Sequence, residues 1–269
     1  CLVCGSSSHL VLVEGGSYTS VPPSGSSGGT TLTDTNFLKP TSGIPAYVIA
    51  ELSATSGGYA LSWDGGPSVA PVAGQAITVT YKFNAVMQEF QPNRQTLSTQ
   101  EVQAFQYAMD LFDNYANITF QESTGATGDI NFAKASLSQS AGSYTAGIAH
   151  TAFYSNGHIA HSTVYVTDHT LTYGYGSNGT ATVIHELAHA LGLSHPRDYN
   201  GASAFSLSAT ADDNRDVSIM SYFDGTNTSS VDPGTAMLYD IATIQYLYGA
   251  NHNYNAGNNT YVIDGSLQT

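Results

Sequence analysis

Residues 183–196 read VIHELAHALGLSHP, and this stretch decides what fold to expect. His185 and His189 are four residues apart, so on a helix both imidazoles leave the same face with Cβ atoms about 5–6 Å apart. Two nitrogens at that separation can reach one zinc ion at about 2.1 Å. Glu186 follows His185 and is rotated about 100° around the helix axis, which keeps its carboxylate beside the metal without making it a ligand. Glu186 is therefore placed to act as a general base on a water held by the metal.

The end of the same stretch supplies a third ligand. Gly192 comes one turn after His189 and is a natural helix stop, because glycine enters the left-handed conformation without a Cβ penalty. His195 can then return to the same metal, and Pro196 has no amide hydrogen with which to continue a helix. A lone histidine is usually structural, but this H-E-x-x-H-x-x-G-x-x-H spacing predicts a zinc site. Three neutral imidazoles leave a fourth position open for water, as in catalytic zinc sites.

A second segment, DVSIMSYF at residues 216–223, lies just downstream of the third histidine. Met220 stands between small polar residues, which favours a tight turn whose thioether forms an apolar floor beneath the ligands. Tyr222, two residues on, would aim its phenol toward the metal. A methionine or tyrosine in a turn usually only packs, but its position after three spaced histidines favours the functional interpretation.

Hydrophobic periodicity along the chain predicts helices and strands in alternation. The expected helices are residues 44–52, 98–116, 178–191 and 236–247, and the expected strands are 76–84, 118–121, 129–133, 146–153 and 163–166. This order predicts an α+β fold with a mixed sheet and helices on one face.

Composition divides the chain into three parts. Residues 1–43 are rich in Gly, Ser and Pro and are expected to form a flexible leader or pro-segment, with one strand between His9 and Val13. The apolar-patterned part, residues 44–255, is expected to be the folded domain that carries the histidine motif, and residues 256–269 a C-terminal extension. Both cysteines, Cys1 and Cys4, lie in the leader. Either thiolate could cap the zinc in a latent precursor, or the pair could form a disulfide or have no defined role; we favour an incidental or pro-segment role.

Charge excludes some classes of partner. The chain has 20 Asp and Glu against 6 Lys and Arg, a formal net charge of −14, and only 10% of its residues are charged. Six scattered bases form no positive stripe, so we expect binding neither to nucleic acid nor to an anionic membrane. No apolar run approaches the roughly 18–20 residues that a membrane span requires. The acidic, nearly cysteine-free composition is typical of exported bacterial proteins, and we expect a secreted, extracellular protein.

At these motifs the sequence resembles the metzincin zinc endopeptidases, and within them the serralysin family. The likeness is carried by SHPRDYN at 194–200, SIMSYF at 218–223 and DIATIQYLYGAN at 240–251, and more weakly by SWDG at 62–65, the strand at Ile77 and the helix at 102–116. The resemblance implies a mixed twisted sheet with long helices and a zinc cleft between an upper sheet subdomain and a lower helical, irregular subdomain. It also implies zinc bound by His185, His189 and His195, with Glu186 as general base, Met220 in the Met-turn and Tyr222 as a mobile fifth ligand.

The sequence departs from the serralysin pattern at Arg197 and in residues 256–269. Arg197 stands where serralysins usually have glycine, so a charge is expected near the cleft. The Gly/Asp-rich calcium-binding repeats that normally follow the protease domain are not seen in residues 256–269, which we expect to be the start of such a domain. Bound Ca²⁺ is therefore an open expectation that no motif in this chain supports.

Together these features predict a secreted, zinc-dependent endopeptidase of protein or peptide substrates, monomeric and a target for a protein inhibitor. An extended substrate would add as a strand to the edge strand at 146–153, which favours broad specificity, and the acidic body favours neutral or basic peptides. His150, His158, His161 and His169 are interpreted as structural or surface residues. Two alternatives remain: an exported adhesin or surface-layer module that keeps zinc for stability, and a zinc amidase acting on cell-wall peptides.

Overall fold

The computed structural model describes residues 2–4, 10–12, 43–85, 93–137, 139–140, 143–169, 171–197, 212–228 and 230–258. Within these ranges every helix is too short or too polar to span a bilayer. Cys1, residues 198–211 of the polar stretch after the third histidine, and residues 259–269 lie outside the described residues. The division into leader, protease domain and extension stays a prediction.

The central sheet is mixed, as the strand and helix order predicts. Its strands are β3 (Ile77–Phe83), β4 (Arg94–Gln95), β5 (Ile118–Glu122), β6 (Ile130–Ala135), β9 (Gly147–Phe153) and β10 (Ile159–Thr167). Five of them follow the order β5-β3-β6-β10-β9, and β4 pairs with β6. The four strands from β5 to β10 are parallel neighbours, whereas β9 runs antiparallel to β10 and ends the sheet. The strand predicted at 146–153 is thus an edge strand, as expected.

Two smaller strand pairs complete the β-structure. They are β1 (Leu2–Cys4) with β2 (Leu10–Leu12), and β7 (Gln139–Ser140) with β8 (Ser143–Tyr144), both antiparallel. The strand predicted in the leader corresponds to β2, and its partner β1 is an addition to the prediction. The strand predicted at 163–166 begins earlier, because β10 continues back to Ile159 through an irregular register that breaks the period-two pattern.

Four helices lie close to the predicted ranges: α1 (Ala46–Glu51), α2 (Thr99–Tyr115), α3 (Asn178–Ala190) and α4 (Leu238–Tyr248). The start of α2 is encoded locally by a capping box. Ser98 Oγ accepts a hydrogen bond from the Glu101 amide at 3.3 Å, and Glu101 Oε2 accepts one from the Ser98 amide at 2.6 Å. Serine followed three residues later by glutamate therefore sets the first turn of this helix.

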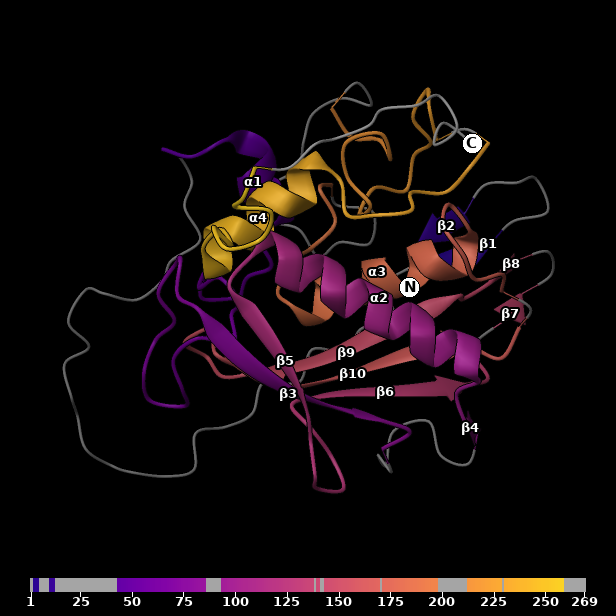
Figure 1. Ribbon diagram of the computed structural model, residues 1–269, viewed down its shortest axis with the longest axis horizontal. Coiled ribbons are helices and arrows are strands. Elements are labelled where there is room, and N and C mark those ends of the chain that lie inside the picture. The colour runs from indigo at the N-terminus through magenta and orange to yellow at the C-terminus, as the bar shows by residue number, and fades with distance from the viewer. Residues whose placement is uncertain are drawn as a thin grey trace.

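The main core lies between one face of the sheet and two helices, α2 and α3 (Figure 1). Phe105 and Phe112 of α2 are completely buried there, and the Phe105 ring packs on Phe132 of β6 with centroids 4.5 Å apart. Burying such a side chain stabilises the fold by about 1.5–3 kcal/mol. Ile184 and Leu187 of α3 belong to the same cluster, so the expected arrangement of helices on one face is confirmed. The apolar face of α3 thus packs against the sheet.

The two remaining helices, α1 and α4, pack against each other beyond one end of α2 (Figure 1). Their side chains reach the segments that follow α3, as shown below. The expected division into an upper and a lower subdomain stays a prediction.

Candidate metal centre

Three buried residues of α3, His185, Glu186 and His189, carry the predicted chemistry. Contacts from distant segments fix the end of this helix. Trp63 Nε1 donates to the Ala190 carbonyl oxygen at 2.9 Å, and Tyr248 Oη donates to the Leu191 carbonyl oxygen at 2.7 Å. Both carbonyls belong to the last turn, where an α-helix has no internal partner for them.

Gly192 then ends the helix, as the sequence predicts. Its φ is +99°, the left-handed region that favours glycine, and a Cβ there would lie 2.5 Å from the Leu61 carbonyl oxygen. No other residue type fits that approach without backbone movement. The turn at Gly192 sends the chain back toward the face of α3 that carries the histidines.

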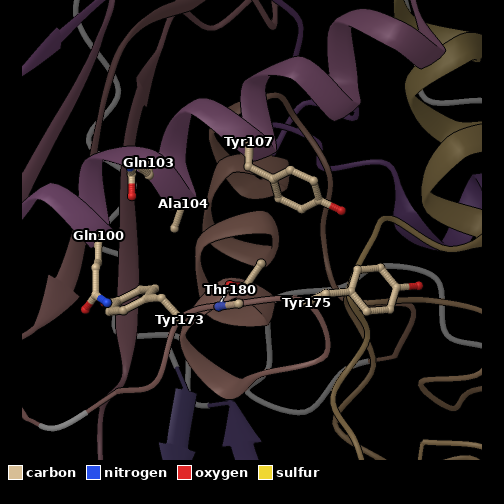
Figure 2. Close-up of a pocket in the computed structure, with 8 residues that line it drawn as sticks. Gln100, Gln103, Ala104, Tyr107, Tyr173, Tyr175 and Thr180 are labelled. Carbon is tan, nitrogen blue, oxygen red and sulfur yellow. Dashed lines mark hydrogen bonds between the residues drawn. The ribbon is translucent and has the colours of Figure 1, made fainter. Parts of the chain in front are cut away.

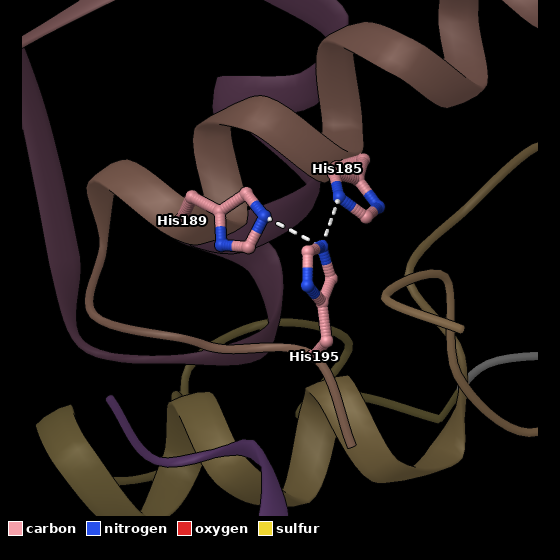
Figure 3. Close-up of side chains that lie close together, drawn as sticks. All are labelled: His185, His189 and His195. Carbon is pink, nitrogen blue, oxygen red and sulfur yellow. Dashed lines mark hydrogen bonds between the residues drawn. The ribbon is translucent and has the colours of Figure 1, made fainter. Parts of the chain in front are cut away.

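The turn brings His195 between His185 and His189 (Figure 3). Nε2 of His195 lies 3.2 Å from Nε2 of His185 and 3.1 Å from Nε2 of His189. A tetrahedral zinc ion with Zn–N distances of about 2.0–2.1 Å holds its ligand nitrogens about 3.3 Å apart. The three imidazoles therefore fit one zinc ion.

The hydrogen bonds of the other ring nitrogens support that fit. His185 Nδ1 lies 2.8 Å from the Ile219 carbonyl oxygen, and His189 Nδ1 lies 2.9 Å from the Leu193 carbonyl oxygen. A carbonyl only accepts, so each Nδ1 carries the proton and each Nε2 turns a lone pair toward the centre. Lone pairs that converge on one point favour binding of a cation there. A carbonyl at the other ring nitrogen is the usual arrangement that orients histidine ligands.

Burial also keeps these rings neutral. It lowers the pKa of His185 and of His195 well below the ordinary value and the pKa of His189 to about 3. A metal binds the neutral imidazole. These rings are already neutral at neutral pH, so protons do not compete with the metal for them.

The Met-turn lies against the triad through Ile219, whose carbonyl accepts from His185. Met220 is completely buried, and its amide donates to Ser218 Oγ at 3.0 Å. The half-buried Tyr222 ring lies near the ligands, with its centroid 4.5 Å from that of His195 and 6.5 Å from that of His185. The structure thus brings the Tyr222 ring close to the histidines, whereas the place of Met220 beneath them stays a prediction.

Glu186 is completely buried beside the first residue of the edge strand β9. A Cβ atom on Gly147 would lie 2.7 Å from Glu186 Cγ, 2.7 Å from Thr182 Cγ2 and 3.0 Å from Glu186 Oε1. Glycine at position 147 therefore lets the carboxylate lie directly against the strand. The sequence carries no local signal for this contact.

Two arginines flank the centre and differ in their contacts. Arg215 is buried and forms ion pairs with Asp224 and Asp232, which close the segment after the Met-turn. Arg197, two residues after the third ligand, lies 6.0 Å from the ring centroid of the exposed Phe223. A positive charge near the site is thus present at Arg197, as expected from the departure at that position.

The remaining candidate residues do not join the centre. Within the described ranges, the three ligand histidines are the one group of three or more metal-binding side chains that come within reach of a single ion. His158 stacks on Tyr154 and its Nδ1 lies 3.0 Å from the Asp64 carbonyl oxygen, and the His150 ring meets the edge of Tyr165. The strand β1 contains Cys4, whereas Cys1 lies outside the described residues, so their role in latency stays a prediction.

A pocket of about 300 Å³ lies elsewhere, between α2 and the start of α3 (Figure 2). Tyr107 of α2 lines it together with Tyr173 and Tyr175 from the segment before α3. It includes none of the residues predicted to act on substrate. We assign it no role in the chemistry of the metal centre.

Two buried histidines on a helix, a third after a glycine turn, a methionine-containing turn next to them and a mixed sheet with an antiparallel edge strand together are typical of metzincins. Residues 75–221 match the family model described as Matrixin, of peptidase family M10. The chain therefore belongs to the matrixin family of peptidases, and the curated relatives that it resembles include serralysins.

Curated relatives support this assignment. The chain is 31% identical over 233 residues to serralysin C of Dickeya chrysanthemi, covering 81% of this chain and 48% of the relative. It is 30% identical over 215 residues to serralysin of Proteus mirabilis, covering 71% and 43%, and 34% identical over 170 residues to metallopeptidase AprA of Pseudomonas marginalis, covering 57% and 35%. The chain thus spans less than half the length of these relatives.

Proposed function

We propose that this chain is a secreted zinc-dependent endopeptidase that hydrolyses peptide bonds of proteins. The observation that carries the proposal is the convergence of three Nε2 atoms, with His185 and His189 each oriented by a carbonyl at its Nδ1. His185, His189 and His195 would hold the ion. Zinc bound there would activate a water molecule and polarise the scissile carbonyl.

Glu186 is the general base in this proposal. Its carboxylate accepts a proton from the attacking water and passes it to the leaving amine, as expected of a base next to the reacting atoms. The buried site and the close approach of Gly147 restrict the positions that the carboxylate can take. Such restriction keeps the base in place during the reaction.

Tyr222 and Met220 have supporting roles. The phenol of Tyr222 would be a mobile fifth ligand when zinc is bound, as the family resemblance implies, and would donate a hydrogen bond to the oxyanion. Loss of such a donor typically costs about 10²–10³-fold in turnover. Met220 provides the apolar floor beneath the ligands.

The substrate binds as an extended strand along β9. This strand is antiparallel to β10 and has no further partner strand among the described residues, so its outer edge can pair with a peptide backbone. Main-chain pairing depends little on side chains, which favours broad specificity. Secretion, a monomeric state, a protein inhibitor and Ca²⁺ belong to the proposal as expectations from the family.

The experiment is proteolysis of casein by the wild-type chain and by Glu186→Gln, with zinc measured in both. We expect one zinc per chain in each protein and cleavage by the wild type alone, abolished by a chelator and restored by zinc. Normal cleavage by Glu186→Gln would overturn the role of Glu186. A zinc-loaded wild type that cleaves no protein would favour the adhesin alternative, and cleavage of cell-wall peptides in place of casein would favour the amidase.

A further inference from the structure

Glu51 and Asp240 are two of the carboxyl groups that are buried outside the motifs that carry the chemistry. Glu51 is the last residue of α1 and Asp240 lies in the first turn of α4, and neither side chain is exposed. The two helices that hold them pack together (Figure 1). A buried carboxyl group is costly unless hydrogen bonds satisfy it, so each must be explained by its contacts.

Asp240 accepts hydrogen bonds from the Met-turn. Its Oδ2 accepts hydrogen bonds from the amides of Ile219 at 2.9 Å and Met237 at 2.6 Å, and its Oδ1 accepts one from Ser218 Oγ at 3.0 Å. The Ile219 carbonyl in turn accepts from His185 Nδ1. The backbone of one residue, Ile219, thus connects the carboxylate of Asp240 to His185.

Glu51 holds the other segment that orients a ligand. Its main-chain carbonyl accepts from the Ser194 amide at 2.7 Å, immediately before the third ligand. The adjacent Leu193 carbonyl accepts from His189 Nδ1. The side chain of Glu51 contacts α4, where its Oε2 accepts a hydrogen bond from Thr243 at 3.3 Å.

Both carboxyl groups have a raised pKa. Burial raises the pKa of Glu51 well above its ordinary value, with the charges of Asp240 and Asp213 adding to the effect. Burial also raises the pKa of Asp240 to about 6, although hydrogen bonds from Ile219, Met237, Ser218 and Met220 oppose the shift. Burial thus favours the neutral form of both groups, whereas the hydrogen bonds that Asp240 accepts favour its charged form. The buried Asp213, which accepts from Ser221 at 2.7 Å, is the third acid of this region.

We propose that Glu51 and Asp240 are positioning residues that act as one unit on the metal centre. Asp240 orients His185 through the backbone of Ile219. Glu51 joins α4, the helix that holds Asp240, to the segment that orients His189 and carries His195. The inference rests on the proposed zinc function and extends the site to α1 and α4, which lie outside residues 75–221 that match the family model.

The test measures zinc affinity by competition with a chelator, together with the unfolding midpoint of the zinc-free chain. Asp240→Asn replaces one accepting oxygen by an NH₂ group that faces donors, so we expect zinc affinity to fall about 10–100-fold, the usual effect of losing a group that orients a ligand. Glu51→Ala should weaken zinc binding in the same direction. Glu51→Gln should stay within about twofold of wild type, because its amide keeps an oxygen that can accept from Thr243, and this rescue separates positioning from general destabilisation.

Glu101→Gln is the matched control. Glu101 is also buried, caps α2 and pairs with Lys134 at 2.7 Å, but it contacts neither the Met-turn nor the segment after α3. Its replacement should lower the unfolding midpoint and leave zinc affinity unchanged.

The proposal is overturned if Asp240→Asn lowers the unfolding midpoint as Glu101→Gln does while its zinc affinity stays within twofold of wild type. If Asp240→Asn does not fold, Ser218→Ala serves instead, since it removes one donor to Asp240 and the acceptor of the Met220 amide. Ser218→Ala with wild-type affinity would also overturn it. A wild-type chain that binds no zinc refutes the proposed function itself, whereas tight zinc binding in every variant refutes only the positioning roles.

Discussion

Gly147→Ala adds one methyl group beside the proposed general base and changes nothing else. The new Cβ would lie 2.7 Å from both Glu186 Cγ and Thr182 Cγ2, and 3.0 Å from Glu186 Oε1. Two of these neighbours are carbon atoms, and carbon atoms pack at about 3.5–4.0 Å. Glu186, the strand or both must therefore move by about 1 Å.

The size of the effect follows from that displacement. Position 147 has no positive φ, so alanine adds no backbone strain there. A misplacement of about 1 Å at a reacting group costs about 10²-fold in rate, which corresponds to about 2.7 kcal/mol of transition-state stabilisation. The proposed zinc ligands are untouched, so the metal content should stay at the wild-type level.

The assay is kcat/KM on a fluorogenic peptide, with zinc content and thermal unfolding measured on the same samples. Gly66→Ala is the control for replacing a glycine, because a Cβ at Gly66 meets nothing within 4 Å. We expect kcat/KM to fall about 10²-fold in Gly147→Ala and to stay unchanged in Gly66→Ala. Full zinc content with wild-type kcat/KM in Gly147→Ala would refute the reasoning, because Glu186 would then tolerate displacement.

Three further predictions concern stability. Trp63→Phe leaves the Ala190 carbonyl without its indole donor and should lower the free energy of unfolding in urea by about 1–2 kcal/mol; an unchanged midpoint would contradict it. Removing zinc with a chelator should lower the thermal midpoint, since a ligand at about 1,000 times its Kd stabilises by about 4 kcal/mol, and calorimetry with and without zinc checks this. Burial raises the pKa of Asp240 to about 6 from 3.8, so its contribution to stability is complete below about pH 4 and lost as the pH rises through 6. The stability of wild type relative to Asp240→Asn should therefore fall by about 3 kcal/mol from pH 4 to 7, and a pH-independent difference in urea unfolding would refute the shift.

Much of the fold follows from local patterns in the sequence. The capping box of Ser98 and Glu101 begins α2, and the glycine at 192 ends α3, because both depend on hydrogen bonds or backbone angles within a few residues. Alternating apolar residues predict the strands, and the strand order then predicts the mixed sheet. β10 was predicted too short because an irregular register near Ile159 interrupts that alternation.

The ligand triad is a local feature for the same reason. Helical spacing places His185 and His189 on one face, and a turn at Gly192 requires only three more residues to return His195. The roles of Glu186, Met220 and Tyr222 remain proposals that the geometry supports. Trp63 and Asp240 were visible in the sequence as parts of family motifs, but their contacts with Ala190 and Ile219 were not.

The sequence by itself thus determined the spacing of the histidines, the capping box that begins α2 and the glycine after α3, since each depends on residues close together along the chain. Only the tertiary structure decided which distant groups orient the ligands. Glu51 meets Ser194, Asp240 meets Ile219 and Gly147 meets Glu186 because packing of separate helices and strands brings them together. No periodicity encodes such contacts, because they depend on how the buried faces fit in three dimensions.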